Sequence, residues 1–475
     1  MTWRLRWPDP AELSLTEAAD AVRDGSLSSL ALTEACLARI EVHDPKLKAF
    51  ISIEREAVLE AARRADVERA AGRIRGPLHG VPLAHKDMYY RKGHISTCGS
   101  KIKRNDVPDV TSTVLARLEA AGALYVGGLN MSEFAAGPTG HNEHYGDCRN
   151  PWNRAHITGG SSSGSGAATA ARLVYGAMGS DTGGSVRLPA GLCGVVGLKP
   201  TYGRISRYGA LPRSWSNDTM GPLCRTVADC ALMTQVVAGA DPNDPTAAAV
   251  PVGDYAAAAD RGVDGLRVGL PKGYFADGVA DEVGRVLEEA AGELETAGAR
   301  IVDVLVPDLK PVYRLGDIIS KSEAASYHGK WMRSCPEDYG GHTRTRTEAG
   351  FHIPATHYLD ALRLRGRHIE AFLATVLTAC DVLLAPVIPM LTPRIDETAF
   401  HDAGNAPEVV TMMTAFTRPM NYLGLPALSV PGGFGPGNLP ISFQVIGRPF
   451  DEETLFAVGG AFQRATEWHD AAPTL

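Results

Sequence analysis

The sequence feature that most constrains the fold is a repeated succession of a helix-type segment and a short apolar run. Residues 111–123 read TSTVLARLEAAGA and lead directly into LYVGGL, a pattern typical of an amphipathic helix followed by a buried strand. The same succession recurs at residues 282–298 before ARIVDVLVP and at residues 358–379 before DVLLAP. Because helices that alternate with buried strands cover the faces of a sheet, we predict an α/β fold with one large mixed β-sheet and helices on both faces.

The front of the chain is predicted to be helical. Ser14 and Glu17 in SLTE form a capping box, which opens a helix that ends near Gly25. Two more helices are expected over residues 29–42 and 54–71. The simplest role of this section is to pack against the next part of the chain.

Residues 241–255, DPNDPTAAAVPVGDY, are the best candidate for a linker.

Composition excludes several classes of protein. The net charge of the 475 residues is −7, which argues against nucleic acid and anionic membranes as partners because both attract basic patches. The eight cysteines are dispersed without a C-x-x-C pair, so neither a disulfide framework nor a zinc framework is expected. The start, MTWRLRWPDPAELSL, lacks the apolar region of a signal peptide. No later run approaches the ~18 apolar residues of a membrane span, and we therefore expect a cytoplasmic protein.

Four short motifs match known functional patterns but lack the context that those patterns need. Residues 160–164 fit G-x-S-x-G with Ser162 as nucleophile, yet the preceding RNPWNRAHITG is polar where a buried strand is required. Residues 100–103 fit S-x-x-K without an accompanying K-T-G. The histidines of residues 141–144 do not have the H-E-x-x-H spacing, and residues 164–166 lack the third glycine of a dinucleotide fingerprint. We do not expect any of the four to carry the function.

Three other features make chemical sense together. Lys86 ends the apolar run GVPLAHK, where burial lowers the pKa of an amine and makes it a usable base, with a salt bridge to Asp87 as the alternative. Residues 159–176, GGSSSGSGAATAARLVYG, place small residues at a helix start, which suits developing negative charge or forms an ordinary serine cap. In residues 179–190, GSDTGGSVRLPA, the glycines let successive N–H groups point into one concavity. Such a concavity suits an oxyanion beside Ser185, and a phosphate-binding loop is the competing interpretation.

These segments together resemble the amidase signature family. GGSSSGS followed by GSDTGGSVRLPAGLCGVVGLKPTYGRIS is similar to its signature, GPLHGVPLAHKD to its lysine segment, and NYLGLPALSVPGGF with LPISFQVIGRPFDEETL to its C-terminal block. The resemblance runs from about residue 13 to the end of the sequence and is weakest between about 253 and 407. It implies the amidase signature fold and a catalytic triad in which Ser185 is the nucleophile, Ser161 the bridging serine and Lys86 the base. It also implies a cis peptide bond between Gly160 and Ser161.

The resemblance further implies an oxyanion hole and no cofactor. The backbone N–H groups of this hole map onto Thr182, Gly183, Gly184 and Ser185. Asp181 and Arg187 are expected to brace the loop that carries them. Neither a metal ion nor an organic cofactor is implied. Ser163 departs from the family pattern, because many members have glycine there, and this puts little in doubt.

The division of the chain follows from the same resemblance. Residues 1–75 form the N-terminal helical section, and residues 76–250 the amidase signature core with the catalytic residues. Residues 251–407 form a variable substrate-pocket region, and residues 408–475 return to the core sheet. The four parts are expected to make one compact domain.

The implied activity is hydrolysis of the carbon–nitrogen bond of a linear amide through an acyl-enzyme on Ser185. We expect a small-molecule amide as substrate, with esters or carbamates as further options, no nucleic-acid or membrane partner, and a homodimer as one admissible assembly. Two alternatives remain. The glutaminase (A) subunit of a tRNA-dependent amidotransferase shares the same motifs, and a non-catalytic binding protein could keep the same fold.

Residues that bind the substrate are the least defined part of the prediction. Those expected in the pocket are Ala135, Ala136, Gly137, Tyr327 and Phe351, and further apolar candidates are Trp331, Ile353 and Met390. They favour an apolar or aromatic acyl group, although core packing explains each of them equally well. In tRNA-dependent amidotransferases the glutamine-binding residues fall in the segment HTRTRTEAGFHIPATHYL, where the resemblance is weak, and this favours the stand-alone amidase.

Overall fold

The computed structural model describes residues 9–399 and 406–475. The first eight residues, which belong to the start without a signal-type apolar region, lie outside the described residues, as does the stretch 400–405 of the predicted variable region. The helices are α1 Leu15–Asp24, α2 Ser29–Leu47, α3 Arg55–Ala70, α4 Thr113–Ala120, α5 Ser163–Ala170, α6 Arg187–Cys193, α7 Val227–Val237, α8 Tyr255–Ala259, α9 Asp281–Thr296, α10 Lys310–Ser334, α11 Gly341–Glu348, α12 Ala355–Thr375, α13 Ile395–Thr398, α14 Ala406–Thr414, α15 Arg418–Leu423 and α16 Glu452–Ala465. The strands are β1 Phe50–Ile53, β2 Pro82–Lys86, β3 Leu124–Leu129, β4 Gly176–Asp181, β5 Val196–Lys199, β6 Thr219–Cys224, β7 Arg267–Gly273, β8 Arg300–Val306, β9 Val382–Pro386, β10 Ala427–Gly435 and β11 Leu439–Ile446.

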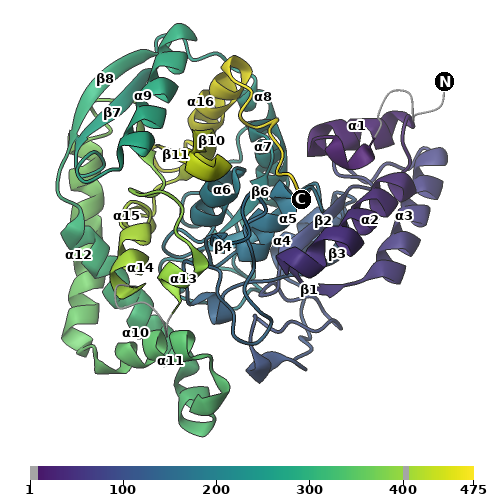
Figure 1. Ribbon diagram of the computed structural model, residues 1–475, viewed down its shortest axis with the longest axis horizontal. Coiled ribbons are helices and arrows are strands. Elements are labelled where there is room, and N and C mark those ends of the chain that lie inside the picture. Colours follow the sequence, from purple (N-terminus) through teal and green to yellow (C-terminus); the bar gives the residue numbers. More distant parts are fainter. Residues whose placement is uncertain (1–8, 400–405) are drawn as a thin grey trace.

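All of these strands join one sheet in the order β1-β3-β2-β4-β6-β5-β10-β11-β9-β7-β8. The sheet is mixed: β2 runs parallel to β3 and β4, and β7 runs parallel to β8 and β9. The central neighbours β4, β6, β5, β10 and β11 pair antiparallel. The front helices α2 and α3 lie at one end of the sheet, and β7, β8 and α9 lie at the other (Figure 1). The predicted α/β class and the large mixed sheet are confirmed.

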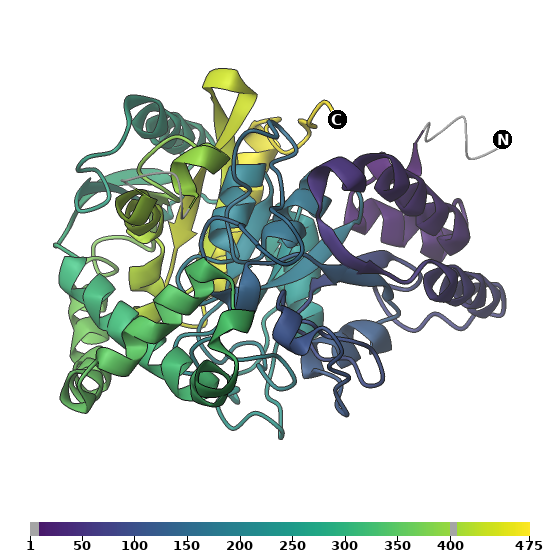
Figure 2. The same cartoon turned by 60° about the horizontal axis from the view of Figure 1, so that its bottom comes forward.

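Helices cover both faces of this sheet, and strand β9 shows why. Its side chains alternate between two separate apolar clusters, because successive residues of a strand point to opposite faces. Val382 and Leu384 join the cluster that contains α1, α7, α9 and α16 side chains. Leu383 and Ala385 join the cluster built with α10, α12 and α15. In both Figure 1 and Figure 2 the green helices α10 to α12 lie on the side of the molecule away from the purple front helices.

The predicted front helices are present, with one change of length. Ser14 caps α1, with the reciprocal capping-box bonds to Glu17, and Gly25 ends the helix with a φ of 81°. The second helix runs on to Leu47 instead of ending at residue 42, with Pro45 in its last turn. The helix expected to start within residues 159–176 is α5, and its glycines and serines are themselves buried in helical conformation.

The expected linker, residues 241–255, is mostly exposed and is anchored to the core at three buried positions, Asp241, Asp244 and Tyr255. The buried carboxylate of Asp241 accepts hydrogen bonds from the hydroxyls of Ser206 and Thr113. After this segment the chain forms α8 and then β7, which joins the same sheet as the preceding strands. The four-part division of the chain remains a prediction.

Candidate active site

Three predicted residues come together where β2 and β4 end. Parallel strands end at the same edge of a sheet, so the last residue of β2, Lys86, lies beside the loop that follows β4 and contains Ser185. Ser161 lies in the turn before α5, and the peptide bond that joins it to Gly160 is cis. The side chains of Lys86 and Ser161 have no exposed surface, and Ser185 is 8% exposed.

The amine of Lys86 is bound to two serine hydroxyls. Its Nζ donates to the Oγ of Ser161 at 2.7 Å and to the Oγ of Ser180 at 2.9 Å. The neighbouring Asp87 instead accepts hydrogen bonds from the backbone N–H and the hydroxyl of Thr97. The structure therefore contains the lysine–serine pair and not the alternative salt bridge to Asp87. Ser180, the second partner of the amine, was not singled out from the sequence.

Burial sets the protonation of Lys86. Loss of hydration lowers the pKa of the amine from 10.5 to about 7, although the charges of Asp218 and Asp181 act in the opposite direction. A lysine with this pKa is neutral in a large fraction of molecules near pH 7 and can accept a proton. Ser162, the nucleophile of the rejected G-x-S-x-G motif, is fully buried and its hydroxyl donates to the carbonyl of Ser180.

The loop after β4 is built around the carboxylate of Asp181. This carboxylate accepts hydrogen bonds from the amides of Gly184, Val186 and Arg187 and from the Arg187 guanidinium, with Nε and Nη2 each 3.1 Å from an oxygen. Burial acts to raise the pKa of Asp181, but Arg187 more than offsets this and holds it well below its usual value. The pair is completely buried and connects the end of β4 to the start of α6.

One of the four predicted oxyanion donors is already engaged. The amide of Gly184 donates to Asp181 at 2.7 Å, so it is committed inside the loop and cannot face a substrate oxygen. Gly184 has a φ of 127°, and a Cβ there would collide with the side chain of Thr417, so only glycine fits. Within the described part of the chain, the amides of Gly183 and Ser185 show no such acceptor.

A cavity opens beside Ser185. Ala135, Ala136, Gly137, Thr182 and Gly183 line it together with residues not foreseen from the sequence. Six of these are polar or charged and central to the site: Arg213, Asp317, Ser320, Lys321, Arg346 and Arg418. Its free volume is only about 30 Å³, the room of roughly one water molecule, because long charged side chains fill it. A substrate must therefore displace or take over some of these side-chain contacts.

Tyr327 and Phe351 do not line this cavity, and their part in substrate binding remains a prediction. Tyr327 packs edge-on against His328 and Trp331, and Phe351 is 47% exposed. Helix α10 turns Asp317, Ser320 and Lys321 toward Ser185, and these positions share one helix face by their spacing. Position 327 lies seven residues beyond Ser320, on nearly the same face of α10 but two turns, about 10 Å, farther along the helix. Of the other apolar candidates, Trp331 stacks on Phe134, and Met390 lines a different cavity.

The charged side chains that line the pocket carry a net positive charge. Asp317 pairs with Lys321 at 2.6 Å and with Arg418 at 3.3 Å. The guanidinium groups of Arg213 and Arg346 form no ion pair with any residue that the structure describes. Each retains a buried nitrogen without a hydrogen-bond partner. Burial, followed by the charge of Arg346, lowers the pKa of Arg213 to about 10, and the two groups remain charged near neutral pH.

Comparison with known proteins identifies the class of enzyme. A family model described as amidase matches residues 31–456, and the chain belongs to this family, the amidase signature family. A relative from Geobacter metallireducens, named as the A subunit of glutamyl-tRNA(Gln) amidotransferase, is 40% identical over 481 residues, covering 96% of this chain and 98% of its own length. The predictions of the family and of an enzyme that acts on carbon–nitrogen bonds are confirmed.

Two solved structures show the same fold. One, from a study of a vestigial protein complex and the evolutionary origins of an s-triazine catabolic enzyme, has a TM-score of 0.88 and 34% identity, covering 95% of this chain and 98% of that one. The other is the A subunit of glutamyl-tRNA(Gln) amidotransferase from Thermotoga maritima, with a TM-score of 0.79 and 33% identity, covering 96% and 95%.

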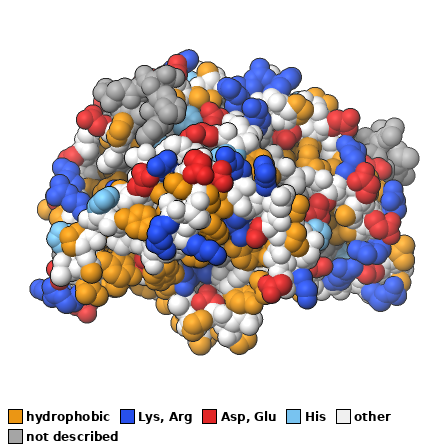
Figure 3. Space-filling view, turned by 90° about the horizontal axis from the view of Figure 1, so that it is seen from below, with side chains coloured by type: hydrophobic (Ala, Val, Ile, Leu, Met, Phe, Trp, Pro, Cys, Tyr) orange, Lys and Arg blue, Asp and Glu red, His pale blue; other side chains and the backbone are white. Residues whose placement is uncertain are grey.

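These relatives overturn the predicted partners. A small-molecule amide substrate without nucleic acid was expected, as was a possible self-assembly into a homodimer, whereas the relatives' name specifies one component of a larger enzyme and a tRNA-linked substrate. The exclusion of nucleic acid came from the net charge, which is a sum over the whole chain and does not report on the partners of one surface. On the face in Figure 3 positive and negative side chains are interspersed.

No helix within residues 9–399 and 406–475 has the length and apolar character needed to cross a membrane. The same ranges contain no group of three or more histidine, cysteine or acidic side chains placed to hold a metal ion. The histidines of HNEH lie at carboxylates instead: His144 is 2.9 Å from Glu133 and His141 is 3.1 Å from Asp147.

Proposed function

We propose that this chain is the glutamine-hydrolysing subunit of a glutamyl-tRNA(Gln) amidotransferase. The observation that carries the proposal is a pair of guanidinium groups beside Ser185, those of buried Arg213 and partly buried Arg346, which form no ion pair with a described residue and each keep a buried nitrogen without a hydrogen-bond partner. A buried cation without a partner is costly, and a substrate carboxylate in contact with it forms charge-assisted hydrogen bonds. Glutamine combines such a carboxylate with the linear amide that this family hydrolyses.

The remaining group of glutamine also has a counterpart. Asp317 is the one acidic side chain among the described residues that line the cavity, and a carboxylate has about four lone-pair positions for donors. Lys321 and Arg418 occupy some of these positions on Asp317. The remaining positions can accept hydrogen bonds from the amino group of glutamine. An uncharged aliphatic or aryl amide would leave Arg213 and Arg346 without partners. The names of the 40%-identical relatives support a subunit of an amidotransferase.

The proposed reaction begins with neutral Lys86. Lys86 accepts a proton from Ser161 while Ser161 takes the proton of Ser185, whose oxygen attacks the amide carbonyl carbon. The oxyanion is bound by the amides of Thr182, Gly183 and Ser185, a contribution of roughly 3–4 kcal/mol for a strong donor. The proton returns through the same path to the leaving nitrogen, which departs as ammonia. Water then hydrolyses the acyl-enzyme to glutamate, and ammonia is the product that an amidotransferase consumes.

The proposal is tested by labelling Ser185 in the presence of amides. The purified chain is treated with a fluorophosphonate and the modified peptide is identified by mass spectrometry. We expect an adduct on Ser185 that is lost in Lys86→Ala, and protection of Ser185 by glutamine but not by butyramide, which has the amide without the carboxylate. Glutamate release from glutamine is measured in parallel. An adduct on Ser162, or equal protection by butyramide, would contradict the proposal.

A further inference from the structure

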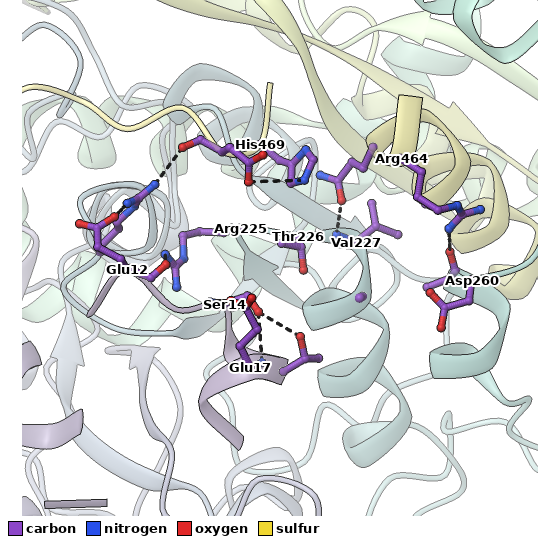
Figure 4. Close-up of a pocket in the computed structure, with 16 residues that line it drawn as sticks. Glu12, Ser14, Glu17, Arg225, Thr226, Val227, Asp260, Arg464 and His469 are labelled. Atoms are coloured by element: carbon purple, nitrogen blue, oxygen red, sulfur yellow. Dashed lines mark hydrogen bonds and ion pairs between the residues drawn. The ribbon is translucent and has the colours of Figure 1, made fainter. Parts of the chain in front are cut away.

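The protein has a second cavity, and none of the residues that line it also lines the cavity beside Ser185. Its volume is about 370 Å³, and it is formed where the start of α1, the start of α7 and the end of α16 meet. Figure 4 shows side chains from these three elements and from the C-terminal segment turned toward one another around it. The proposed amide hydrolysis does not use this cavity.

Buried hydrogen-bond donors without acceptors line this cavity. Arg225 is 7% exposed; its Nη1 donates to the carbonyl of Glu12 at 2.9 Å, but its Nε and Nη2 have no hydrogen-bond partner in the described structure. Gln463 is 8% exposed; its Oε1 accepts the Val227 amide at 2.7 Å, and its Nε2 is likewise without a partner. Two buried side chains therefore present three N–H-bearing nitrogens and no acceptor, which is costly unless a ligand supplies oxygen atoms.

Two more side chains add nitrogens without hydrogen-bond partners at the same place. The Nε of Arg172 and the Nδ1 of His469 also lack partners among the residues described. Arg172 is otherwise held at the cavity wall, because it pairs with the Glu12 carboxylate and donates to the carbonyl of Asp470 at 3.0 Å. The cavity also meets the N-terminal end of α7, where the helix dipole favours negative charge.

The acidic side chains are at the rim of the cavity. Glu12 is 44% exposed and Asp470 is 72% exposed, and Glu17 and Asp260 are exposed as well. Asp229, a buried acid of α7, does not line the cavity; its Oδ1 accepts hydrogen bonds from the amide and hydroxyl of Thr16, and the charge of Arg225 acts on this carboxylate without a direct ion pair. Acids around the opening repel an extended polyanion such as a nucleic-acid backbone. A small anion can pass between them and reach the donors inside.

We propose that this cavity binds a phosphate-type oxyanion, either inorganic phosphate or the phosphate group of a small ester. Its oxygens accept hydrogen bonds from Nε and Nη2 of Arg225 and from Nε2 of Gln463, contacts that are short and strong because the acceptor is charged. The bound ion connects Arg225, which precedes α7, with Gln463 of α16. Its binding stabilises the folded chain in proportion to RT ln(1 + [L]/Kd).

The variant that tests the site is Gln463→Glu. Glutamate keeps the oxygen that accepts the Val227 amide, so the fold is retained, but it replaces the amide donor with a negatively charged oxygen. Arg225→Gln removes the guanidinium as a second test. Arg285→Gln is the matched control, because Arg285 is an exposed arginine of α9 that pairs with Glu289. All three changes lie outside the proposed catalytic residues and should leave the glutaminase rate without phosphate unchanged.

Inorganic phosphate is titrated into each protein by calorimetry, and Tm is followed over the same concentrations. We expect one site per chain in the wild type and in Arg285→Gln, with a Tm that rises with phosphate concentration, and at least tenfold weaker binding in Gln463→Glu. Glycerol 3-phosphate is titrated in parallel, and whichever ligand binds more tightly identifies the free ion or an ester as the occupant. Absence of saturable binding of either ligand, or wild-type affinity in a folded Gln463→Glu protein, would overturn the proposal. If Arg225→Gln does not fold, Gln463→Glu alone decides.

Discussion

The Nζ of Lys86 donates to the Oγ of Ser161 across 2.7 Å, and neither side chain has any surface exposed to solvent. Both the protonation of the amine and the direction of the proton path are therefore set by the protein interior and not by water. The amine, the bridging hydroxyl and the loop of Ser185 meet at the shared edge of β2 and β4. This arrangement leads to predictions about rate, pH, substrate affinity and stability.

The kcat/KM for glutamine should rise with pH and level off above an inflection near pH 7. Lys86 acts as a base only when neutral, and burial lowers its pKa to about 7, so the active fraction grows as pH increases through that value. Initial rates at low glutamine concentration, measured from pH 5.5 to 9, give the profile. A flat profile over this range would exclude Lys86 as the base.

Asp218→Asn should move this inflection to lower pH. The carboxylate of Asp218 raises the pKa of Lys86, so its removal makes the amine easier to deprotonate. Asp218 accepts the Thr182 hydroxyl at 2.6 Å, and the amide oxygen of asparagine retains an acceptor for that contact. Glu289→Gln, a change on the exposed face of α9, is the control and should leave the inflection in place. A shift to higher pH in Asp218→Asn would show that another group controls the profile.

Lys86→Met should lower kcat by at least ~100-fold, the usual contribution of a general base. The chain contains a natural control, because Lys199 is also fully buried with a pKa lowered by burial to about 7. Its amine donates to the carbonyl of Pro200 and is not linked to the serine pair. Lys199→Met should keep kcat within tenfold of the wild type. Equal losses in the two variants would indicate a general effect of removing a buried amine.

Arg346→Met should raise the KM for glutamine roughly 10- to 100-fold with a smaller change in kcat. A hydrogen bond to a charged group contributes about 1.5–3 kcal/mol, and an interaction with the substrate carboxylate is present in the ground state and the transition state alike. Arg344 on the same helix is exposed and pairs with Glu348 at 2.7 Å. Arg344→Met should therefore behave like the wild type. Steady-state kinetics with glutamine decide, and an unchanged KM in Arg346→Met would remove the basis of the substrate assignment.

Asp181→Asn should destabilise the folded chain by ~3–5 kcal/mol. Its carboxylate is completely buried and is the counter-ion of Arg187, and loss of one member of a buried pair leaves the other charge without compensation. The urea concentration at half-unfolding measures the effect. Asp396→Asn is the control, because Asp396 pairs with Arg394 on the surface, and it should leave the midpoint unchanged. A midpoint like that of the wild type in Asp181→Asn would show that the pair does not hold the loop.

The sequence was sufficient to predict a large mixed sheet and the segments that contain Lys86, Ser161 and Ser185, because each of these segments has a contiguous local pattern. An apolar run that ends in lysine, and a glycine pair before a serine, can be recognised within ten residues. The strand order could not be predicted in the same way, since β5 pairs with β10 more than two hundred residues later and no local pattern encodes that choice.

The pocket residues were missed for a related reason. Arg213, Arg346 and Arg418 lie in three separate segments and become neighbours only through the packing of α11 and α15 onto the core. An arginine in an irregular segment or in a helix has no sequence context that distinguishes a buried, unpaired group from a solvated one. Tyr327 was chosen for its aromatic character, but it lies two turns farther along α10 than the residues that line the cavity beside Ser185, and it packs against His328 and Trp331.

The groups proposed to break the bond and the groups proposed to select the substrate come from different stretches of the chain. The groups proposed to break the bond lie within residues 86–185. The charges proposed to surround the substrate come from later positions: Arg213, Asp317, Arg346 and Arg418. Substitutions confined to these later positions can exchange one amide for another while the proton path and the loop after β4 are preserved. Proteins with this fold can thus come to hydrolyse a different amide through a few substitutions, and every intermediate on that path keeps its catalytic residues.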